Sequence, residues 1–453
     1  MGSAPKGMDL QQSAALGRQK RKQVPRSAHR AWAPPPERPD PVQILLDQES
    51  TRVPELVGLR HHRMLASPFT FLRGAAAVMA LDLQHTPTTG LKVQACGDAH
   101  LANFGLYGTP ERRMIFDVND FDETLAAPWE WDVKRLACSF VVAGRTYGHA
   151  DAENDAMAAA CVRRYHAHMV EAASMSHLEV WYARVDAQSV DRILGATPAE
   201  AERTIQKARA GTSTSHELSK LTTTSGGSRR FVDHPPLVEH IDQGSGPETQ
   251  AGGLAIHARY RASLDPERRV LLDRYQLVDT VRKVVGVGSV GTRCSVGLLV
   301  GASPDDALFL QVKEAQASVL EAVTASSPFP NHAERVVRGQ RLCQAASDLF
   351  LGWVRAADGR DYYVRQLADM KLSVDSETLS SAQLADYAEA CGWVLARAHA
   401  RSGDPAAIAG YLGTGDTFDA AVVAFANAYA DQTERDFADF AAAARSGRVA
   451  TGD

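Results

Sequence analysis

The chain has 453 residues, of which 45% are hydrophobic and 23% charged, and its formal net charge is −5 at pH 7. A chain of this length and composition is expected to fold as a globular protein with more than one core, and the negative net charge gives no electrostatic basis for binding nucleic acid. The six cysteines are scattered without a C-x-x-C pair and no apolar run approaches a membrane span, so we expect a cytoplasmic protein without a disulfide framework.

Residues 1–41 form a basic and proline-rich segment. Six arginines and lysines lie between Arg18 and Arg30, and no apolar stretch of the kind found in signal peptides follows them. Three consecutive prolines from Pro34 then interrupt any helix. We predict a tail that is disordered or laid over the surface; the alternative is a tail whose basic cluster binds an anionic partner.

Residues 42–274 are predicted to form a helix-rich lobe that carries two polar loops. Helices are expected over 43–49, 54–64, 68–83, 129–145 and 151–174, with strands over 91–96 and 114–118. The first strand leads into Gly97-Asp98 and the second toward Asp120, which suits a catalytic-loop hairpin because a scaffold must position the loop residues. Residues 211–253 read as loop, either a substrate-binding segment or a linker.

Residues 275–370 are predicted to form a β-rich lobe, and residues 371–453 are predicted to return to the helical lobe. Strands are expected over 278–285, 293–300, 307–312 and 362–367, with helices over 332–349, 384–401 and 418–445. The fold class predicted from these elements is α+β.

The segments 97–103 and 116–123 contain the groups that phosphoryl transfer to a hydroxyl needs. One carboxylate must accept the proton of the hydroxyl, and an amide oxygen and a second carboxylate must hold Mg²⁺ against the nucleotide phosphates. Asp98, Asn103 and Asp120 supply these groups, with Asp117 and Asp122 as alternative or second metal ligands. The predicted catalytic set is Asp98, Asn103 and Lys313, and the predicted metal ligands are Asn103, Asp120 and Asp122.

The glycine-rich segment 286–291 has the pattern G-x-G-x-x-G, which occurs in Rossmann folds and in kinase nucleotide loops. A Rossmann motif must open a helix, whereas the segment after Gly291 is rich in β-branched residues and leads through a turn to a strand that ends at Lys313. A hairpin with a glycine-rich tip followed by a lysine strand favours a kinase nucleotide site. The predicted nucleotide-binding residues, for ATP with Mg²⁺, are Gly286, Gly288, Ser289, Gly291 and Lys313.

The segment from Gly97 to Asn103 resembles the catalytic loop G-D-x-H-x-x-N of the aminoglycoside-phosphotransferase branch of the kinase-like superfamily, and Asp120-Phe121-Asp122 resembles its metal-binding segment. The resemblance implies a two-lobe, protein-kinase-like fold. Its motifs stand in reversed order here, and residues 391–400 resemble the helix that normally runs into the catalytic loop, so we expect a circular permutation. This hypothesis requires Lys313 and Asp120 to lie within about 15 Å of each other, because both must reach one nucleotide.

Motifs and order together resemble a bacterial family of unknown function, DUF2252, from about Gly17 to Ala444. The most specific segments are 67–74, 96–105, 119–137, 286–293 and 339–341. Membership implies the kinase-like fold but no settled substrate. The resemblance also suggests that Asp132 is a buried residue that braces the catalytic loop.

Other polar residues have less defined roles in the sequence. The partner of Lys313 is expected among Glu314, Glu321 and Glu334, and Glu334 is favoured because it precedes the strongest helical run. His100 is expected to support the loop by hydrogen bonding, and Arg73 to contact either phosphate or a carboxylate. Four further histidines lack a third metal ligand and are expected on the surface: His61, His62, His166 and His168.

The leading functional hypothesis is an ATP- and Mg²⁺-dependent phosphotransferase acting on an unidentified small-molecule or protein acceptor. A nucleotidyl transferase could use the same site, and a pseudokinase-like module would bind nucleotide as a conformational ligand only. A dinucleotide oxidoreductase is the remaining alternative.

Overall fold

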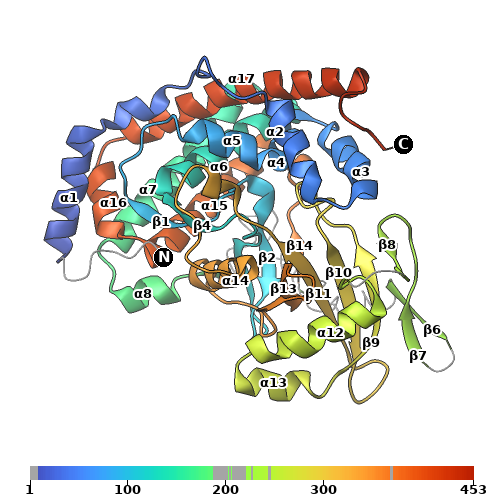
Figure 1. The fold of residues 1–453 in the computed structure, drawn as a ribbon. Helices are drawn as coiled ribbons and strands as arrows, with labels where there is room; N and C mark the ends of the chain where they lie inside the picture. Colours follow the sequence, from blue (N-terminus) through green and yellow to red (C-terminus); the bar gives the residue numbers. More distant parts are fainter. Residues whose placement is uncertain are drawn as a thin grey trace.

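The structure, a computed structural model, combines helices with antiparallel sheets (Figure 1), and the predicted mixed α+β class is confirmed. It describes residues 9–186, 203, 206, 221–225, 228–242, 246–367 and 371–452. Within these ranges no helix combines the length and apolarity needed to cross a bilayer.

The largest sheet has six strands in the order β12-β13-β11-β10-β9-β8, each antiparallel to its neighbours. Its strands are β8 (Val238–Glu239), β9 (Gln276–Lys283), β10 (Cys294–Val300), β11 (Ala307–Ala315), β12 (Gly352–Arg355) and β13 (Asp361–Gln366). The glycine-rich segment joins β9 to β10, and Lys313 lies near the end of β11, as the sequence predicted.

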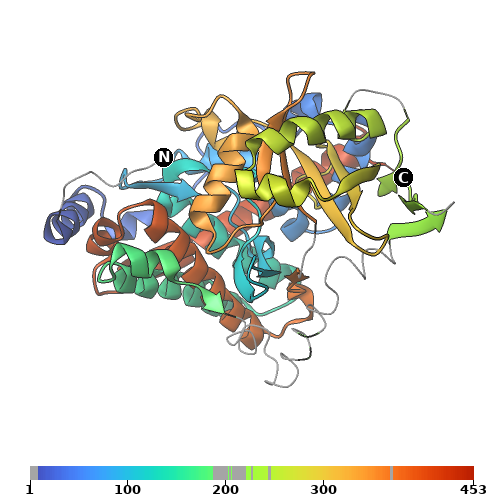
Figure 2. The ribbon, with the colours of Figure 1, turned by 90° about the horizontal axis from the view of Figure 1, so that it is seen from below.

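Side chains of β11 alternate between the two faces of this sheet. Leu308, Leu310 and Val312 pack with α12 (Gln250–Tyr260) and α13 (Pro266–Leu272), which cover one face in Figure 2. Phe309 faces the opposite side, where it contacts Phe231 of the hairpin formed by β6 (Thr222–Ser225) and β7 (Ser228–Phe231). Since Lys313 is four residues after Phe309, it lies on that same side of the sheet, away from α12 and α13, and its ammonium group reaches Asp122.

Helix α14 (His332–Cys343) connects β11 to β12 and ends six residues before the predicted end of 349. The chain leaves the helix because the Ala345 N–H donates to Asp117 and the Gln344 side chain donates to the Val118 carbonyl, at 2.8 and 2.7 Å. These bonds attach the end of α14 to β3 (Met114–Val118), which lies outside the six-stranded sheet.

The helical part surrounds a large apolar core and lies above and to the left of the six-stranded sheet in Figure 1. Trp129 stacks on Tyr165 within this core, with ring centroids 5.7 Å apart. The helices of this part are α1 (Leu10–Gln23), α2 (Pro41–Asp47), α3 (Pro54–Met64), α4 (Pro68–Gly74), α5 (Ala76–Leu83), α6 (Trp129–Thr146), α7 (Asp151–Ala172), α8 (His177–Tyr182), α15 (Ser381–Ser402), α16 (Pro405–Leu412) and α17 (Thr417–Arg445).

Two smaller sheets position the polar loops. One pairs β1 (Lys92–Ala95) with β4 (Leu125–Pro128), and the other has the order β14-β2-β3-β5. Its strands are β2 (Phe104–Gly108), β3 (Met114–Val118), β5 (Val185–Asp186) and β14 (Leu372–Ser373). The two predicted strands therefore exist, but β1 and β3 belong to different sheets and the hairpin is formed by β2 and β3.

Three sequence predictions differ from the structure in detail. Leu10–Gln23 is not an irregular tail but a helix, because Asp9 and Gln12 form a capping box and Arg21 binds the Tyr411 carbonyl at 2.7 Å. The predicted helix 68–83 breaks at Ala75, beside the Gly74 carbonyl that accepts from Arg60. The predicted loop 211–253 includes β6 (Thr222–Ser225) and β7 (Ser228–Phe231), whereas 211–220, 226–227 and 243–245 lie outside the described residues.

Candidate active site

The turn after β1 presents Asp98. The backbone N–H groups of Cys96 and Gly97 donate to the buried Asp132 carboxylate at 2.6 and 3.0 Å. Gly97 has φ +82°, and a Cβ at this position would lie 2.3 Å from the Glu123 carbonyl oxygen, so only glycine fits. Asp132 thus braces this turn, and His399 of α15 contacts the same carboxylate at 3.2 Å.

Asp98 lies in a setting that favours its protonated form more than water does. Burial raises the pKa of Asp98 to about 7, although Arg135, which donates to Oδ1 at 2.6 Å, opposes the shift. The side chain keeps 22% of its surface open. Burial also holds the pKa of His100 well below its usual value, so the neutral ring 3.8 Å away adds no positive charge. A carboxyl with this pKa can exchange a proton near neutral pH.

Asn103 ends the short 3₁₀ turn Leu101–Asn103 that follows Asp98. Its side-chain NH₂ donates to the Asp98 carbonyl oxygen at 2.8 Å, and this bond fixes which end of the amide is the acceptor. The turn is held from behind, because Ser139 accepts from the Leu101 N–H at 3.0 Å and the Tyr387 hydroxyl donates to the Leu101 carbonyl. The amide oxygen of Asn103 is therefore the atom available to a ligand.

Lys313 forms an ion pair with Asp122, a residue 191 positions away in the chain. Burial lowers the pKa of Lys313, but the adjacent Asp122 outweighs it and holds that pKa well above the ordinary value. Ser289 lies in the glycine-rich segment 286–291, called the glycine loop below, and accepts from the same ammonium group at 2.8 Å. The Tyr363 hydroxyl donates to Asp122 at 2.8 Å. The Asp122 N–H in turn donates to Asp120 Oδ1 at 3.2 Å, which places Asp120 next to this pair.

The glutamates considered as partners of Lys313 have other contacts. Glu334 pairs with Arg338 at 2.8 Å on α14, and Glu314 pairs with Arg293 at 3.4 Å. Glu321 caps the 3₁₀ helix that begins after Ser318. In the described residues the ion-pair partner of Lys313 is Asp122, so the preference for Glu334 was wrong.

The glycine loop is held by residues that precede α3. The Val53 N–H donates to the Gly291 carbonyl at 2.8 Å, and the Arg52 guanidinium donates to the Val290 carbonyl. Burial lowers the pKa of Arg52, and four carboxylates around it oppose the shift. The loop is therefore attached to the helical part at its base.

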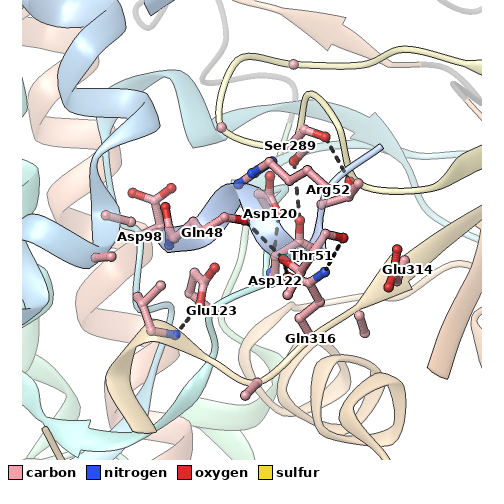
Figure 3. Close-up of a pocket in the computed structure, with 18 of the residues that line it drawn as sticks. Gln48, Thr51, Arg52, Asp98, Asp120, Asp122, Glu123, Ser289, Glu314 and Gln316 are labelled. Carbon is pink, nitrogen blue, oxygen red and sulfur yellow. Dashed lines mark hydrogen bonds between the residues drawn. The ribbon is translucent and has the colours of Figure 1, made fainter. Parts of the chain in front are cut away.

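Two cavities of about 770 and 750 Å³ adjoin at the glycine loop, where Asp120, Gly286 and Ser289 line both. Asp98 and Asn103 line the first cavity, and Lys313 lines the second. In the view of Figure 3, Asp120 and Asp122 lie between Asp98 and Glu314. The predicted site residues from the helical and the strand-rich parts are thus brought together.

The side-chain oxygen atoms of Asn103 and Asp120 suit a magnesium ion whose other positions are filled by a ligand and water. Within the described ranges no cluster of three His, Cys, Asp or Glu side chains forms a complete metal cage. Asn103 and Asp120 offer one amide oxygen and one carboxylate, and Mg²⁺ in nucleotide sites keeps phosphate oxygens and water for its remaining positions. Asp122, the third predicted ligand, contacts Lys313 and Tyr363.

Several residues lie elsewhere than the sequence predicted. Asp117, an alternative metal ligand, is buried in an ion pair with Arg397 and lines neither of the two cavities. Three histidines expected on the surface are buried at 0, 8 and 3% exposure: His61, His166 and His168. They face partners on distant helices, such as Asp419 for His166, and a local pattern does not reveal such contacts.

The cavity residues Arg52 and Glu123 were given no role from the sequence, whereas Arg73 was expected to contact phosphate or a carboxylate. Arg73 lines the first cavity from the end of α4, and Glu123 lines it beside Asp122. Burial raises the pKa of Glu123, and its carboxylate accepts from the Val319 N–H at 2.7 Å. For Glu123, the sequence signal that could have indicated its place in the cavity was its position directly after Asp120 and Asp122.

The fold and the site define a mixed α+β protein with a polar cavity in two parts between its largest sheet and its helices. The chain belongs to the family described as "Uncharacterized protein conserved in bacteria (DUF2252)", which matches residues 52–443. No curated protein and no solved structure matches the chain. Because these comparisons name no activity, the function has to follow from the geometry of the site.

Proposed function

We propose that the protein is an ATP- and Mg²⁺-dependent phosphotransferase that transfers the terminal phosphoryl group of ATP to a hydroxyl group. The observation that carries the proposal is the convergence of Asp98, Asn103 and Asp120 with Lys313 on two adjoining cavities. Lys313 is far in the sequence from Asp98, Asn103 and Asp120, yet all four line these cavities. Polar and charged groups gathered in a cavity in this way are typical of a functional site.

In the proposed reaction Asp98 accepts the proton of the acceptor hydroxyl. The hydroxyl oxygen forms a bond to the terminal phosphorus atom while the bond from that phosphorus to the bridging oxygen breaks, and ADP leaves. A pKa of about 7 matches this role, because a base works best when its pKa is near the operating pH. Arg135 holds the Asp98 carboxylate in one orientation.

Asn103 and Asp120 would hold Mg²⁺, which neutralises charge on the phosphates when bound. Lys313 pairs with the phosphates in the proposed complex, and Asp122 together with Ser289 keeps its ammonium group in place. We therefore assign Asp122 to the orientation of Lys313 rather than to the metal.

The connectivity supports a kinase-like, circularly permuted arrangement. Strands β9 and β10 form a hairpin with the glycine loop at its tip, β11 carries the lysine, and α14 follows β11. Protein kinases have a glycine loop, a lysine strand and a helix in this order. At the other end of the chain, α15 ends beside β1, where the Gln94 N–H donates to Ser402 at 3.0 Å. A helix that ends next to the strand entering the Asp98 turn is what a permutation between them requires.

The cavity sizes favour a small-molecule acceptor. Each cavity falls within the range of about 300 to 1,000 Å³ that small-molecule sites occupy. We assign the cavity that carries Asp98 to the acceptor and the cavity beside Gln366 and Leu367 to the nucleoside.

ADP release in the presence of acceptor pools tests the proposal. The wild-type protein and an Asp151→Asn control, changed at an exposed residue of α7, should turn over ATP only with Mg²⁺, and Asp98→Asn should not. Nucleotide binding without turnover across a broad acceptor screen would identify a binding module. NAD binding that needs no Mg²⁺ and is lost in Gly288→Ala would identify an oxidoreductase.

A further inference from the structure

Arg73 is a partly buried cation at the first cavity, and its guanidinium has no ion pair among the described residues. Its Nε is buried without a hydrogen-bond partner, and its nearest aromatic contact is the Phe69 ring, 5.8 Å from Cζ. Burial lowers the pKa of Arg73, and Asp98 and Asp120 are among the groups that oppose this shift. An arginine in such a place is costly unless an anion completes its surroundings.

Other buried arginines near the site have partners in the protein. Arg135 is paired with Asp98, and Arg397 with Asp117. Arg335 donates to three backbone carbonyl groups at 2.7 to 2.8 Å. Arg335 and Arg397 also have a buried Nε without a hydrogen-bond partner, but their other guanidinium nitrogens are bonded to the protein. Arg73 differs because its guanidinium makes no hydrogen bond or ion pair with the described residues, which leaves the group for a ligand.

The position of Arg73 identifies the part of the ligand that it can reach. Its carbonyl oxygen lies 2.9 Å from where a Cβ of Gly288 would be, so the end of α4 touches the middle of the glycine loop. Asp98 and Asp120 both line the cavity that Arg73 faces. The glycine loop, the base and the metal carboxylate enclose the terminal phosphoryl group in kinase-like sites.

We propose that Arg73 binds the terminal phosphoryl group of the nucleoside triphosphate and stabilises the charge on it during transfer. The inference rests on the proposed function and adds to it an arginine supplied by the protein's own chain. Lys313 would bind the phosphates from the strand-rich side, and Arg73 would bind the terminal group from the helical side. In phosphoryl transfer an arginine in this role contributes a factor of about 10³ to 10⁵ in rate.

The experiment compares Mg²⁺-dependent binding of ADP and of β,γ-imido-ATP, which has the terminal phosphoryl group but is not hydrolysed. Arg73→Met should weaken binding of β,γ-imido-ATP by about ten-fold or more and leave ADP binding within about two-fold, because only the first ligand has the terminal group. Retained ADP binding also shows that the variant folds. Arg73→Lys, which keeps the charge but not the planar fork, should be intermediate.

Arg164→Met is the matched control, because Arg164 is a partly exposed arginine of α7, outside both cavities, that pairs with Glu171 at 3.3 Å. It should bind both nucleotides as the wild type does. Equal losses for ADP and β,γ-imido-ATP in Arg73→Met would overturn the assignment and indicate a structural role. Unchanged binding of both, with a higher KM for the acceptor, would overturn it in favour of acceptor binding. If the wild type binds neither nucleotide, the proposed function fails as well.

Discussion

Replacing Asp132 by asparagine tests how the Asp98 turn is held. The carboxylate accepts from the N–H groups of Cys96 and Gly97 and contacts His399. Asparagine has one side-chain oxygen, so its NH₂ group would face one of these buried N–H donors. That donor would lose its hydrogen-bond acceptor, which costs about 1 to 3 kcal/mol of stability. The remaining bonds lose the strength that the charge gives them, so the turn should be destabilised by about 2 to 4 kcal/mol in total.

Amide hydrogen exchange of the peptide 92–103 measures this cost where it arises. The destabilisation corresponds to roughly 30- to 1,000-fold faster exchange at Cys96 and Gly97 if these amides open locally. ATP turnover should fall with it, because a displacement of about 1 Å at a catalytic group costs on the order of 100-fold. Asp151→Asn is the control at an exposed carboxylate. Exchange at 92–103 that is the same in wild type and Asp132→Asn would refute the bracing role.

Three further predictions concern the charged groups of the site. Burial raises the pKa of Asp98 from 3.8 to about 7, so kcat/KM for ATP turnover should rise with pH and level off above about pH 7. A flat profile from about pH 5.5 to 8.5 would contradict the assignment of Asp98 as the base. The native state binds the Asp98 proton more tightly than the unfolded state does, so the wild type loses stability as the pH rises from about 4 to 7. Asp98→Asn does not lose this proton, so in urea unfolding its deficit relative to the wild type should be smaller at about pH 8 than at about pH 5. Lys313→Met leaves the partly exposed Asp122 carboxylate without its cation and should cost about 1 to 3 kcal/mol in the same unfolding assay, with most of the loss recovered in Lys313→Met/Asp122→Asn; a double variant no more stable than the single one would refute the pairing.

The elements of the site could be predicted because their signals are local. Strand β3 has the predicted bounds, Met114–Val118, and the alternation of β11 identifies Lys313 as a residue at a strand end. The turn at Gly97 follows from glycine preceding a polar run. These features depend on a few neighbouring residues, so the sequence pattern is sufficient to find them.

The partners within the site could not be predicted, because they come from separate elements. A helix glutamate was expected beside Lys313, whereas the ion pair is with Asp122. For Arg73 the sequence left phosphate and a carboxylate as equal alternatives, and only the break at Ala75 and the contact with the glycine loop place it at the cavity. Contacts of this kind depend on how helices and sheets pack, which a single sequence does not fix.

The central claim is that Mg²⁺ and ATP bind together through Asp120 and Lys313, and a thermal-shift comparison tests it most directly. ATP at about 100 times its dissociation constant stabilises a protein by about 2.7 kcal/mol, which is about 3 °C for a chain whose unfolding entropy is about 1 kcal/mol/K. The account predicts this shift for wild type with ATP and Mg²⁺, and no shift with EDTA or in Asp120→Asn. A shift of the same size in Asp120→Asn, or one produced by NAD without Mg²⁺, would contradict it.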